Sequence, residues 1–202
     1  MNTEPVVYII DDDPAARESI AALIQSQDLA VMPFASAEDF LAKYDSSQRG
    51  CLIVDVRMKG MSGLDLQEQL AKQHANLPVI VITGFADVPM AVRAMRSGAV
   101  TFLEKPSGEQ AISDAIHLAL DQEARANELR QQRDQIEQNY ASLTPAELLV
   151  LDQLMQGMPN KAIASELDLG LRTVELRRAT IMKKMHADSL AELVRLVLSL
   201  RS

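Results

Sequence analysis

Four short, unbroken apolar runs limit what this 202-residue chain can fold into more than any other feature. They read VVYII, CLIVD, PVIVIT and AVTFLEK, and a weaker fifth run reads LAVMPF. Unbroken runs are typical of parallel strands that are covered on both faces of a sheet. The stretches between them, such as PAARESIAALIQS, SGLDLQEQLAKQ and VPMAVRAMRSG, have the apolar spacing of amphipathic helices. Alternating strands and helices predict an α/β domain with a doubly wound, parallel, five-stranded sheet.

The rest of the chain is predicted to be helical. Between Gly108 and Tyr140 there is no proline and no further glycine, which favours one long helix. After Ser142 the pattern changes to four short helices separated by glycine, proline and aspartate. We therefore expect a first domain of residues 1–122, a helical linker of residues 123–141, and a small all-helical domain of residues 142–202.

The long helix carries a heptad stripe that has two interpretations. The stripe consists of Ile112, Ala115, Ala119, Gln122, Ala126, Leu129, Arg133, Ile136, Tyr140 and Leu143. It can be a coiled-coil dimer seam, which the polar Gln122 and Arg133 interrupt and weaken. Alternatively, the helix is single and solvated, and its stripe packs on its own domain. The residues alone leave both interpretations open.

The net charge of −8 is unevenly distributed. Residues 1–122 hold 9 Lys and Arg against 17 Asp and Glu, whereas residues 142–202 hold 8 against 7. The acidic surplus therefore does not exclude nucleic-acid binding by the last domain.

The N-terminal segment has no basic or long apolar region, and no apolar run approaches the roughly 20 residues of a membrane span. We expect a cytoplasmic protein without membrane contact, in which the single cysteine, Cys51, is a buried hydrophobe.

Acidic side chains follow two of the predicted strands. Asp11, Asp12 and Asp13 come after the first strand, and Asp55 ends the third. The carboxyl ends of parallel strands meet at one edge of a sheet, so we expect these carboxylates to converge. A cluster of oxygen ligands without His or Cys favours Mg²⁺.

A hydroxyl and an ammonium group reach the same edge, because Thr83 ends the fourth strand and Lys105 the fifth. This combination suits phosphate chemistry. A carboxylate attacks a phosphoryl group to form an acyl phosphate, Mg²⁺ neutralises the phosphoryl oxygens, and Lys and a hydroxyl bind those that remain. Asp55 is the candidate nucleophile.

The ordered set of an Asp pair, Asp55, Thr83 and Lys105-Pro106 resembles the receiver domain of two-component response regulators, from residue 5 to about residue 120. The resemblance implies that a sensor histidine kinase phosphorylates Asp55. It implies Mg²⁺ ligands, which are Asp11, Asp12, Asp55 and the backbone carbonyl of Arg57. It also implies phosphate contacts from Thr83 and Lys105, a switch in which Thr83 and Phe102 turn inward, and a cis Lys105–Pro106 bond.

The stretch ITGFADVPMAVRAMRSGAVTFLEKP is similar to the FixJ-type subgroup of transcription factors. In that subgroup the fourth helix and fifth strand form a phosphorylation-dependent dimer surface. Two positions depart from the usual pattern. Lys59 replaces a proline and adds a cation beside the acidic cluster, and Ser107 replaces an aromatic residue. We expect these changes to affect the lifetime of the phosphorylated state and the dimer surface.

The last domain contains a short helix around residues 161–167, a tight break, and a helix dense in Arg and Lys, which is typical of a helix-turn-helix. A basic helix alone is also compatible with an ordinary solvated surface. In a helix-turn-helix, base edges would be met by Thr173, Glu175, Leu176 and Arg177. Phosphates would be met by Lys161, Arg178 and Lys183, within a basic face that includes Arg172.

The surrounding residues resemble the four-helix LuxR-type DNA-binding domain over nearly all of residues 142–202. The resemblance rests on an LT-x-x-E opening, on Asn160-Lys161, Ile163-Ala164 and RTVE from Arg172, and on the closing SLAELVRLVLSL. Gly170-Leu171 replaces a usual Ser-Pro start, which weakens the cap of the recognition helix. Arg177 replaces a usual histidine.

Together the two resemblances imply a phosphorylation-controlled transcription factor. A histidine kinase phosphorylates it, it forms a homodimer, and paired helix-turn-helix domains bind an inverted-repeat operator, with RNA polymerase as a further partner. The alternative is a phosphorylation-independent DNA-binding regulator that dimerises through the linker helix. An enzyme, a phosphohydrolase with Asp55 as nucleophile, is disfavoured because the sequence shows no substrate lid and no strong cue for a turnover base.

Overall fold

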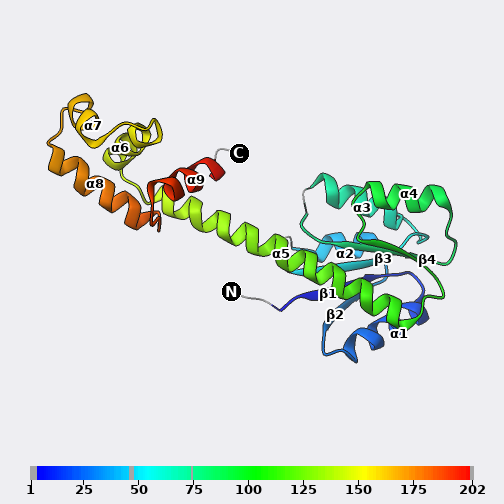
Figure 1. Cartoon of the computed structure of the whole chain (residues 1–202). Coiled ribbons are helices and arrows are strands. Elements are labelled where there is room, and N and C mark those ends of the chain that lie inside the picture. Colours follow the sequence, from blue (N-terminus) through cyan, green and yellow to red (C-terminus); the bar gives the residue numbers. More distant parts are fainter. Residues whose placement is uncertain (1–3, 46–47, 74, 201–202) are drawn as a thin grey trace. The chain divides into compact units, whose positions relative to one another are not determined.

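The strands form the predicted parallel five-stranded sheet, in the order β2-β1-β3-β4-β5 (Figure 1). Their bounds are β1 Val6–Ile10, β2 Ala30–Phe34, β3 Gly50–Asp55, β4 Val79–Thr83 and β5 Thr101–Glu104. The order reverses direction between β1 and β3, which are paired neighbours. Their carboxyl ends therefore flank the switch point, where doubly wound folds place their sites.

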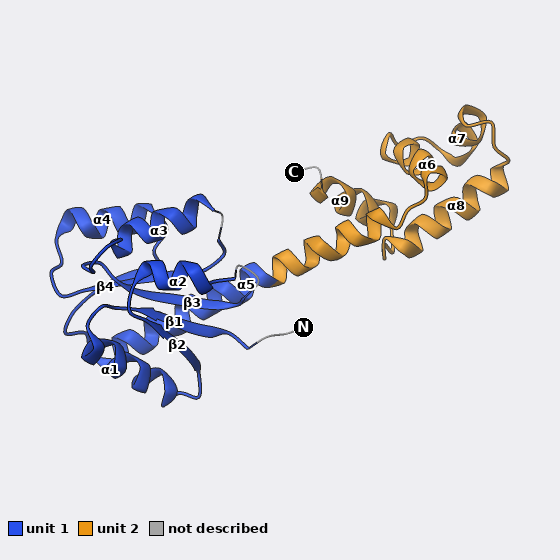
Figure 2. Ribbon diagram, turned by 180° about the vertical axis from the view of Figure 1, so that it is seen from behind, with its two compact units in different colours: residues 1–127 blue, residues 128–202 orange. Residues whose placement is uncertain are grey.

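The structure is a computed structural model that describes residues 4–45, 48–73 and 75–200. The chain divides into two compact units, residues 1–127 and residues 128–202 (Figure 2). The division falls inside the stretch expected to be the linker. In the part of the chain that is described, no helix is long and apolar enough to cross a membrane.

Helices cover both faces of the sheet in the first unit. Their bounds are α1 Pro14–Gln25, α2 Ala37–Lys43, α3 Gly63–Lys72 and α4 Val88–Arg96. On one face, α2, α3 and α4 pack through residues such as Phe40, Leu66 and Ala94. On the other face, α1 and the first part of α5 pack through Ile24 and Ile116. The inner strands are buried on both faces, which explains their unbroken apolar sequences, whereas the edge strand β2 is largely exposed and has the weakest run.

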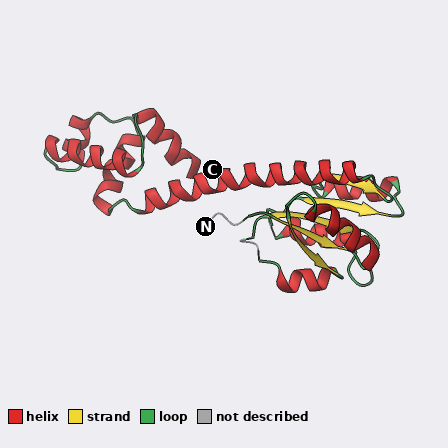
Figure 3. Cartoon of the chain, turned by 90° about the horizontal axis from the view of Figure 1, so that it is seen from below, coloured by secondary structure: helices red, strands yellow, loops and turns green. Residues whose placement is uncertain are grey.

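The second unit is all helical, as predicted (Figure 3). Its helices are α6 Pro145–Met155, α7 Asn160–Glu166, α8 Leu171–Lys184 and α9 Leu190–Leu200. A reciprocal cap starts α6: Thr144 Oγ1 accepts a hydrogen bond from the Glu147 N–H at 3.3 Å, and Glu147 Oε2 accepts one from the Thr144 N–H at 2.7 Å. The helices enclose a core that includes Val150, Ile163 and Ile181.

Helix α5, Glu109–Ala141, contributes to the cores of both units. In its heptad stripe, Ile112 and Ala119 are buried in the core of the first unit, and Ile136 packs against the core of the second. These parts of the stripe pack on their own chain, as the second interpretation expected. Between them, Leu129 is 68% exposed. A dimer seam through this exposed segment stays a prediction.

The cap of α6 can be tested by Thr144→Ala, which removes the hydroxyl acceptor from the Glu147 N–H. We expect the second unit to lose about 1 kcal/mol of stability, the usual cost of deleting a capping hydroxyl. Hydrogen exchange of the α6 amide groups in the full chain measures the loss. The control is Thr180→Ala, because Thr180 lies inside α8 and its hydroxyl only bonds the Leu176 carbonyl. It should change stability by less than about 0.5 kcal/mol, and equal losses in both variants would contradict the capping role.

Candidate functional site

The acidic site is formed where β1 and β3 end side by side. Asp11 follows β1 and Asp55 ends β3, and both residues are almost fully buried, with exposed fractions of 2% and 5%. Asp12 is only partly buried, and its Oδ2 accepts a hydrogen bond from the Lys59 N–H at 3.2 Å. Asp13 is separate from the site, since it caps α1 by accepting a hydrogen bond from the Ala15 N–H. The structure therefore brings Asp11 and Asp55 together.

Lys105 joins the two buried carboxylates. Its Nζ donates hydrogen bonds to Asp11 Oδ2 at 2.6 Å and to Asp55 Oδ1 at 2.7 Å. The residue follows β5, and its N–H donates to the Thr83 carbonyl on β4, which places the side chain at the carboxyl edge of the sheet. The predicted cis Lys105–Pro106 bond is confirmed. The ammonium group offsets the repulsion between two like charges that are withdrawn from water.

The environment shifts the pKa of both charged partners. Burial raises the pKa of Asp55 above its usual value, the contacts with Lys105 partly oppose this, and the charge of Asp11 adds to the rise. Burial lowers the pKa of Lys105, but the hydrogen bonds to Asp11 and Asp55 outweigh it and leave the pKa raised. The second oxygen of Asp55 accepts a hydrogen bond from the Arg57 N–H at 2.6 Å. Asp55 is therefore a buried carboxylate held by a cation on one oxygen and by an amide on the other.

The predicted hydroxyl and aromatic residues lie nearby in the sheet. Thr83 ends β4 and is fully buried, and its Oγ1 accepts a hydrogen bond from the Phe85 N–H at 3.3 Å. Phe102, on β5, is half-buried and packs against the core on the face covered by α2, α3 and α4. No hydrogen bond from Thr83 to Asp55 is formed among the described residues.

The donor chemistry of this edge suits a hard cation. Asp11 and Asp55 present carboxylate oxygens, and with Lys105 between them the three groups still carry one net negative charge. Carboxylate and carbonyl oxygens without a nearby nitrogen or sulfur ligand are the set that Mg²⁺ prefers. The described residues hold no cluster of three His, Cys, Asp or Glu placed as a ready-made metal cage.

The structure shows three contacts around the site that the sequence did not predict. The Arg57 guanidinium lies over the Phe85 ring, 4.6 Å from its centroid. Lys59, the unusual residue after β3, meets Asp12 through its backbone N–H. The hydroxyl of Ser107 donates to the Glu104 carbonyl at 2.7 Å, so the second unusual residue closes a local turn. The first two contacts depend on how two loops approach one another, for which sequence patterns carry no signal.

The second candidate site is the outer face of α8. The helix buries Val174 and Ile181 in the core, while its opposite face is exposed. The exposed predicted residues are Arg172, Thr173, Glu175, Leu176 and Lys183. Leu176 is 69% exposed, so its apolar side chain is available on this face of the helix. The predicted weak start of α8 is confirmed, since Gly170 provides no side-chain cap.

Three predicted DNA-binding residues have more specific surroundings. Arg177 and Arg178 are partly buried, and Arg178 Nη1 donates a hydrogen bond to Asn160 Oδ1 at 3.0 Å. This bond ties α8 to the first residue of α7. Lys161, the next residue of α7, is exposed. Arg178 therefore has a structural partner inside the helix-turn-helix, whereas Lys161 does not show one among the described contacts.

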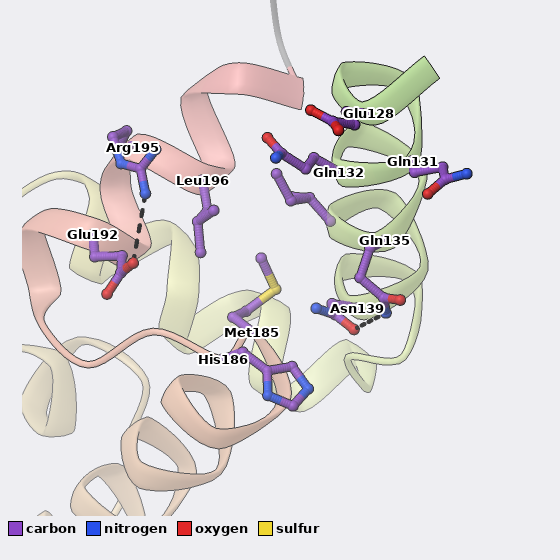
Figure 4. A pocket seen from close by; sticks show the side chains of 11 residues that line it. Glu128, Gln131, Gln132, Gln135, Asn139, Met185, His186, Glu192, Arg195 and Leu196 are labelled. Carbon is purple, nitrogen blue, oxygen red and sulfur yellow. Dashed lines mark hydrogen bonds and ion pairs between the residues drawn. The ribbon is translucent and has the colours of Figure 1, made fainter. Parts of the chain in front are cut away.

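A groove of about 810 Å³ lies within the second unit, between the second half of α5 and the helices α8 and α9 (Figure 4). Side chains from α5 such as Gln132 and Gln135 line one side, and Glu192 and Leu196 of α9 line the other. Met185, directly after α8, forms part of its wall. The groove keeps this length of α5 from packing closely against α9.

Two family models match the chain, one for each unit. Residues 7–117 match the response regulator receiver domain. Residues 141–197 match the luxR family of bacterial regulatory proteins. The first match alone covers more than half of the chain.

Full-length relatives support the same assignment. The transcriptional regulatory protein FixJ of Azorhizobium caulinodans is 45% identical over 192 residues, which cover 95% of this chain and 91% of that protein. The solved structure of the response regulator StyR superposes with a TM-score of 0.89 at 43% identity, covering 98% of this chain and 100% of StyR. Full-length FixJ from B. japonicum gives a TM-score of 0.58 at 39% identity, covering 99% of this chain and 98% of that one.

The raised pKa of Asp55 predicts that its ionised carboxylate destabilises the first unit. A raised pKa in the folded state means that folding favours the protonated carboxyl group. The contribution of Asp55 to the free energy of unfolding is therefore complete below the unfolded pKa of about 3.9, and it is lost as the pH rises through the folded pKa. Asp55→Asn should therefore stabilise the metal-free first unit near pH 7, and the gain should grow as the pH rises through the folded pKa. Urea unfolding in EDTA between about pH 4 and pH 7 checks this. A gain that fails to grow with pH, or a loss of stability, would contradict the burial argument.

Proposed function

Because the chain belongs to the two-component response regulators that join a receiver domain to a LuxR-type DNA-binding domain, we propose that phosphorylation of Asp55 controls its binding to DNA. The family is one of transcriptional regulators and not of enzymes. The proposal rests above all on the buried pair of Asp11 and Asp55 that Lys105 bridges. A sensor histidine kinase is the proposed phosphate donor.

In the proposed reaction an Asp55 carboxylate oxygen attacks the phosphorus of a phosphohistidine. The new P–O bond makes an acyl phosphate while the P–N bond breaks, and its electron pair returns to the imidazole nitrogen. Lys105 is placed to pair with a phosphoryl oxygen, since its ammonium group already contacts Asp55 Oδ1 at 2.7 Å. The Thr83 hydroxyl, at the end of β4, is the proposed second phosphate ligand.

Mg²⁺ is the proposed cofactor. The proposed ligands are Asp11, Asp12, Asp55 and the backbone carbonyl of Arg57. When bound, Mg²⁺ neutralises charge on the phosphoryl oxygens. The chain's own residues supply the position of the acceptor, because the Arg57 N–H and the Lys105 ammonium fix both oxygens of Asp55.

The proposed switch uses Thr83 at the end of β4 and Phe102 on the neighbouring strand β5. Thr83 Oγ1 now accepts from the Phe85 N–H, and turning it toward a phosphoryl group gives up this 3.3 Å hydrogen bond. Phe102 is half-buried on β5, which pairs with β4, and its inward turn is the proposed second step once Thr83 turns. We propose that this change exposes or reshapes the homodimer surface.

In the second unit the exposed face of α8 is the proposed reader of DNA. Its first turns carry Thr173, Glu175 and Leu176, all exposed, and α8 is the second helix of the helix-turn-helix. Phosphate contacts are proposed from the exposed Lys161, Arg172 and Lys183, and from Arg178, which also donates a hydrogen bond to Asn160. The half-buried Arg177 is a proposed base contact. This sorting separates residues that position the helix from residues that read sequence.

We propose that the functional domains are residues 1–122 and 142–202, joined by a linker of residues 123–141 within α5. On DNA, two copies would bind the halves of an inverted repeat in the cytoplasm, with RNA polymerase as a further partner. The competing function, a regulator that binds DNA independently of phosphorylation, is favoured by one feature, the exposed stretch of α5 around Leu129 that a second copy can cover.

Incubation with Mg²⁺ and acetyl phosphate tests the phosphorylation proposal. We expect intact mass spectrometry to show one added phosphoryl group on the wild-type chain and none on Asp55→Asn. Asp13→Asn is the matched control, because Asp13 is acidic and near in sequence but only caps α1. It should be labelled as the wild type is. Absence of the adduct on the wild type, under conditions that label another receiver domain, would favour the phosphorylation-independent alternative.

The DNA-reading proposal predicts different effects for Leu176→Ala and Lys161→Ala. Leu176 offers an apolar surface to a thymine methyl group, so its loss should weaken binding to a duplex selected from a random library by roughly tenfold. Its binding to unselected DNA should stay nearly constant. Lys161→Ala should weaken binding to both kinds of DNA, because phosphate contacts carry no sequence information. Fluorescence anisotropy measures both affinities, and parallel losses on both DNAs for Leu176→Ala would contradict base reading.

A further inference from the structure

One ammonium group in the second unit touches the end or start of three helices. Lys184 is the last residue of α8, and its Nζ donates to Glu147 Oε2 at 2.7 Å and to the Ser142 carbonyl at 3.0 Å. Glu147 Oε2 also accepts from the Thr144 N–H, as part of the cap of α6. Ser142 is the first residue after α5. The ammonium thus links the end of the linker helix, the start of α6 and the end of the DNA-reading helix.

The surroundings make this contact stronger than an ordinary surface ion pair. Glu147 is buried, and its pKa is lowered chiefly by the side chain of Lys184 and then by the backbone N–H of Thr144. The Lys184 side chain is itself only 30% exposed. The Ser142 carbonyl lies at the negative end of α5, where a cation is favoured. The Lys184 ammonium, the Glu147 carboxylate and the Ser142 carbonyl are therefore hydrogen-bonded to one another through Lys184. We call this group of contacts the Lys184 junction.

The neighbouring lysine has different surroundings. Lys183 is exposed, and on a helix it lies seven residues after Leu176, on the side of α8 that carries the base-reading residues. Lys184 is turned about 100° away, toward α5 and α6. Two adjacent residues of the same charge thus separate two roles, contact with DNA and contact within the chain.

Among the described residues, α5 packs on the core of the second unit near its end. Ile136 and Tyr140 are partly buried against the core, but upstream of them α5 borders the groove, with Gln132 and Gln135 on its wall (Figure 4). A displacement of α5 upstream of Ile136 would break no contact with the core of the second unit among the described residues. At the end of the helix, however, it acts directly on the Ser142 carbonyl and hence on Lys184.

We propose that Lys184 is a positioning residue through which the state of the linker helix α5 sets the DNA affinity of α8. The inference rests on the proposed control of DNA binding by Asp55 phosphorylation and adds the route within the second unit. Lys184 keeps the recognition helix in register with the end of α5, so a change at α5 reaches α8 through the junction. Without the junction, the two helices are coupled by the core alone.

The test compares Lys184→Gln with Lys183→Gln in the full chain, with and without acetyl phosphate and Mg²⁺. The probe is a duplex that the wild-type chain selects from a random library, measured at several salt concentrations. For Lys184→Gln we expect the phosphorylation-induced gain in affinity to fall by at least about twofold, with an unchanged salt slope. For Lys183→Gln we expect the gain to be unchanged and the salt slope to fall by about one.

Two further variants separate positioning from simple loss of structure. Lys184→Arg keeps the cation and should restore the phosphorylation-induced gain. Glu147→Gln keeps an acceptor for the Thr144 N–H but removes the charge that faces Lys184. It should reduce the gain by itself and add little in combination with Lys184→Gln, because both remove the same contact. Hydrogen exchange of the core amides of the second unit confirms that each variant is folded.

Three results would overturn the inference. A salt slope that falls for Lys184→Gln as it does for Lys183→Gln would make Lys184 a DNA contact. An affinity loss of equal size with and without acetyl phosphate would make the junction purely structural. An unchanged gain would show that the core alone couples the helices. Failure of the proposed function is a separate result, because it shows already in the wild type as a missing Asp55 adduct or as DNA affinity that ignores the adduct.

Discussion

Two buried carboxylates of like charge, Asp11 and Asp55, share the ammonium group of Lys105, and much of the first unit is arranged to make this possible. The sheet order places β1 beside β3, so their ends bring the carboxylates together, and β5 supplies the lysine from two strands away. Buried charge is costly unless it is paired. The site therefore depends on strand order as much as on the identity of the three residues, and shifting any strand by one residue would separate them.

The same pairing explains why the site is suited to a change of state. With Lys105 engaged, the three groups keep one excess negative charge, and the pKa of Asp55 is raised by burial. A cation or a phosphoryl group that enters this edge must compete with, or share, the contacts of Lys105. In the part of the chain that the structure describes, the Thr83 hydroxyl accepts a 3.3 Å hydrogen bond from the Phe85 N–H. The carboxylates and Lys105 hold one another through short ion pairs, whereas the Thr83 hydroxyl has a longer hydrogen bond. Thr83 is therefore the group that can reorient at the lower cost in free energy.

Residue spacing was sufficient to predict the strands, most of the helices and the edge at which the polar residues meet. The strand runs are buried on both faces, and the positions after β1, β3, β4 and β5 follow from parallel topology. The short helix α2 was missed, because seven residues span only two turns and leave little periodic signal. The separate role of Asp13 as a helix cap was also missed, since consecutive aspartates look alike in sequence but point to different neighbours. Contacts between distant loops, such as Arg57 with Phe85, depend on tertiary packing.

Helix α8 shows how one segment serves both the fold and recognition. Val174 and Ile181 face the core, and Arg178 and Lys184 hold α8 to its neighbours through Asn160 and Glu147. Thr173 and Leu176 take no part in this anchoring and remain exposed. Because Val174 and Ile181 face the core whereas the proposed reading residues are exposed, we expect changes at the exposed positions to affect stability little. Regulators that share this fold can therefore differ in target sequence while keeping the same anchored helix.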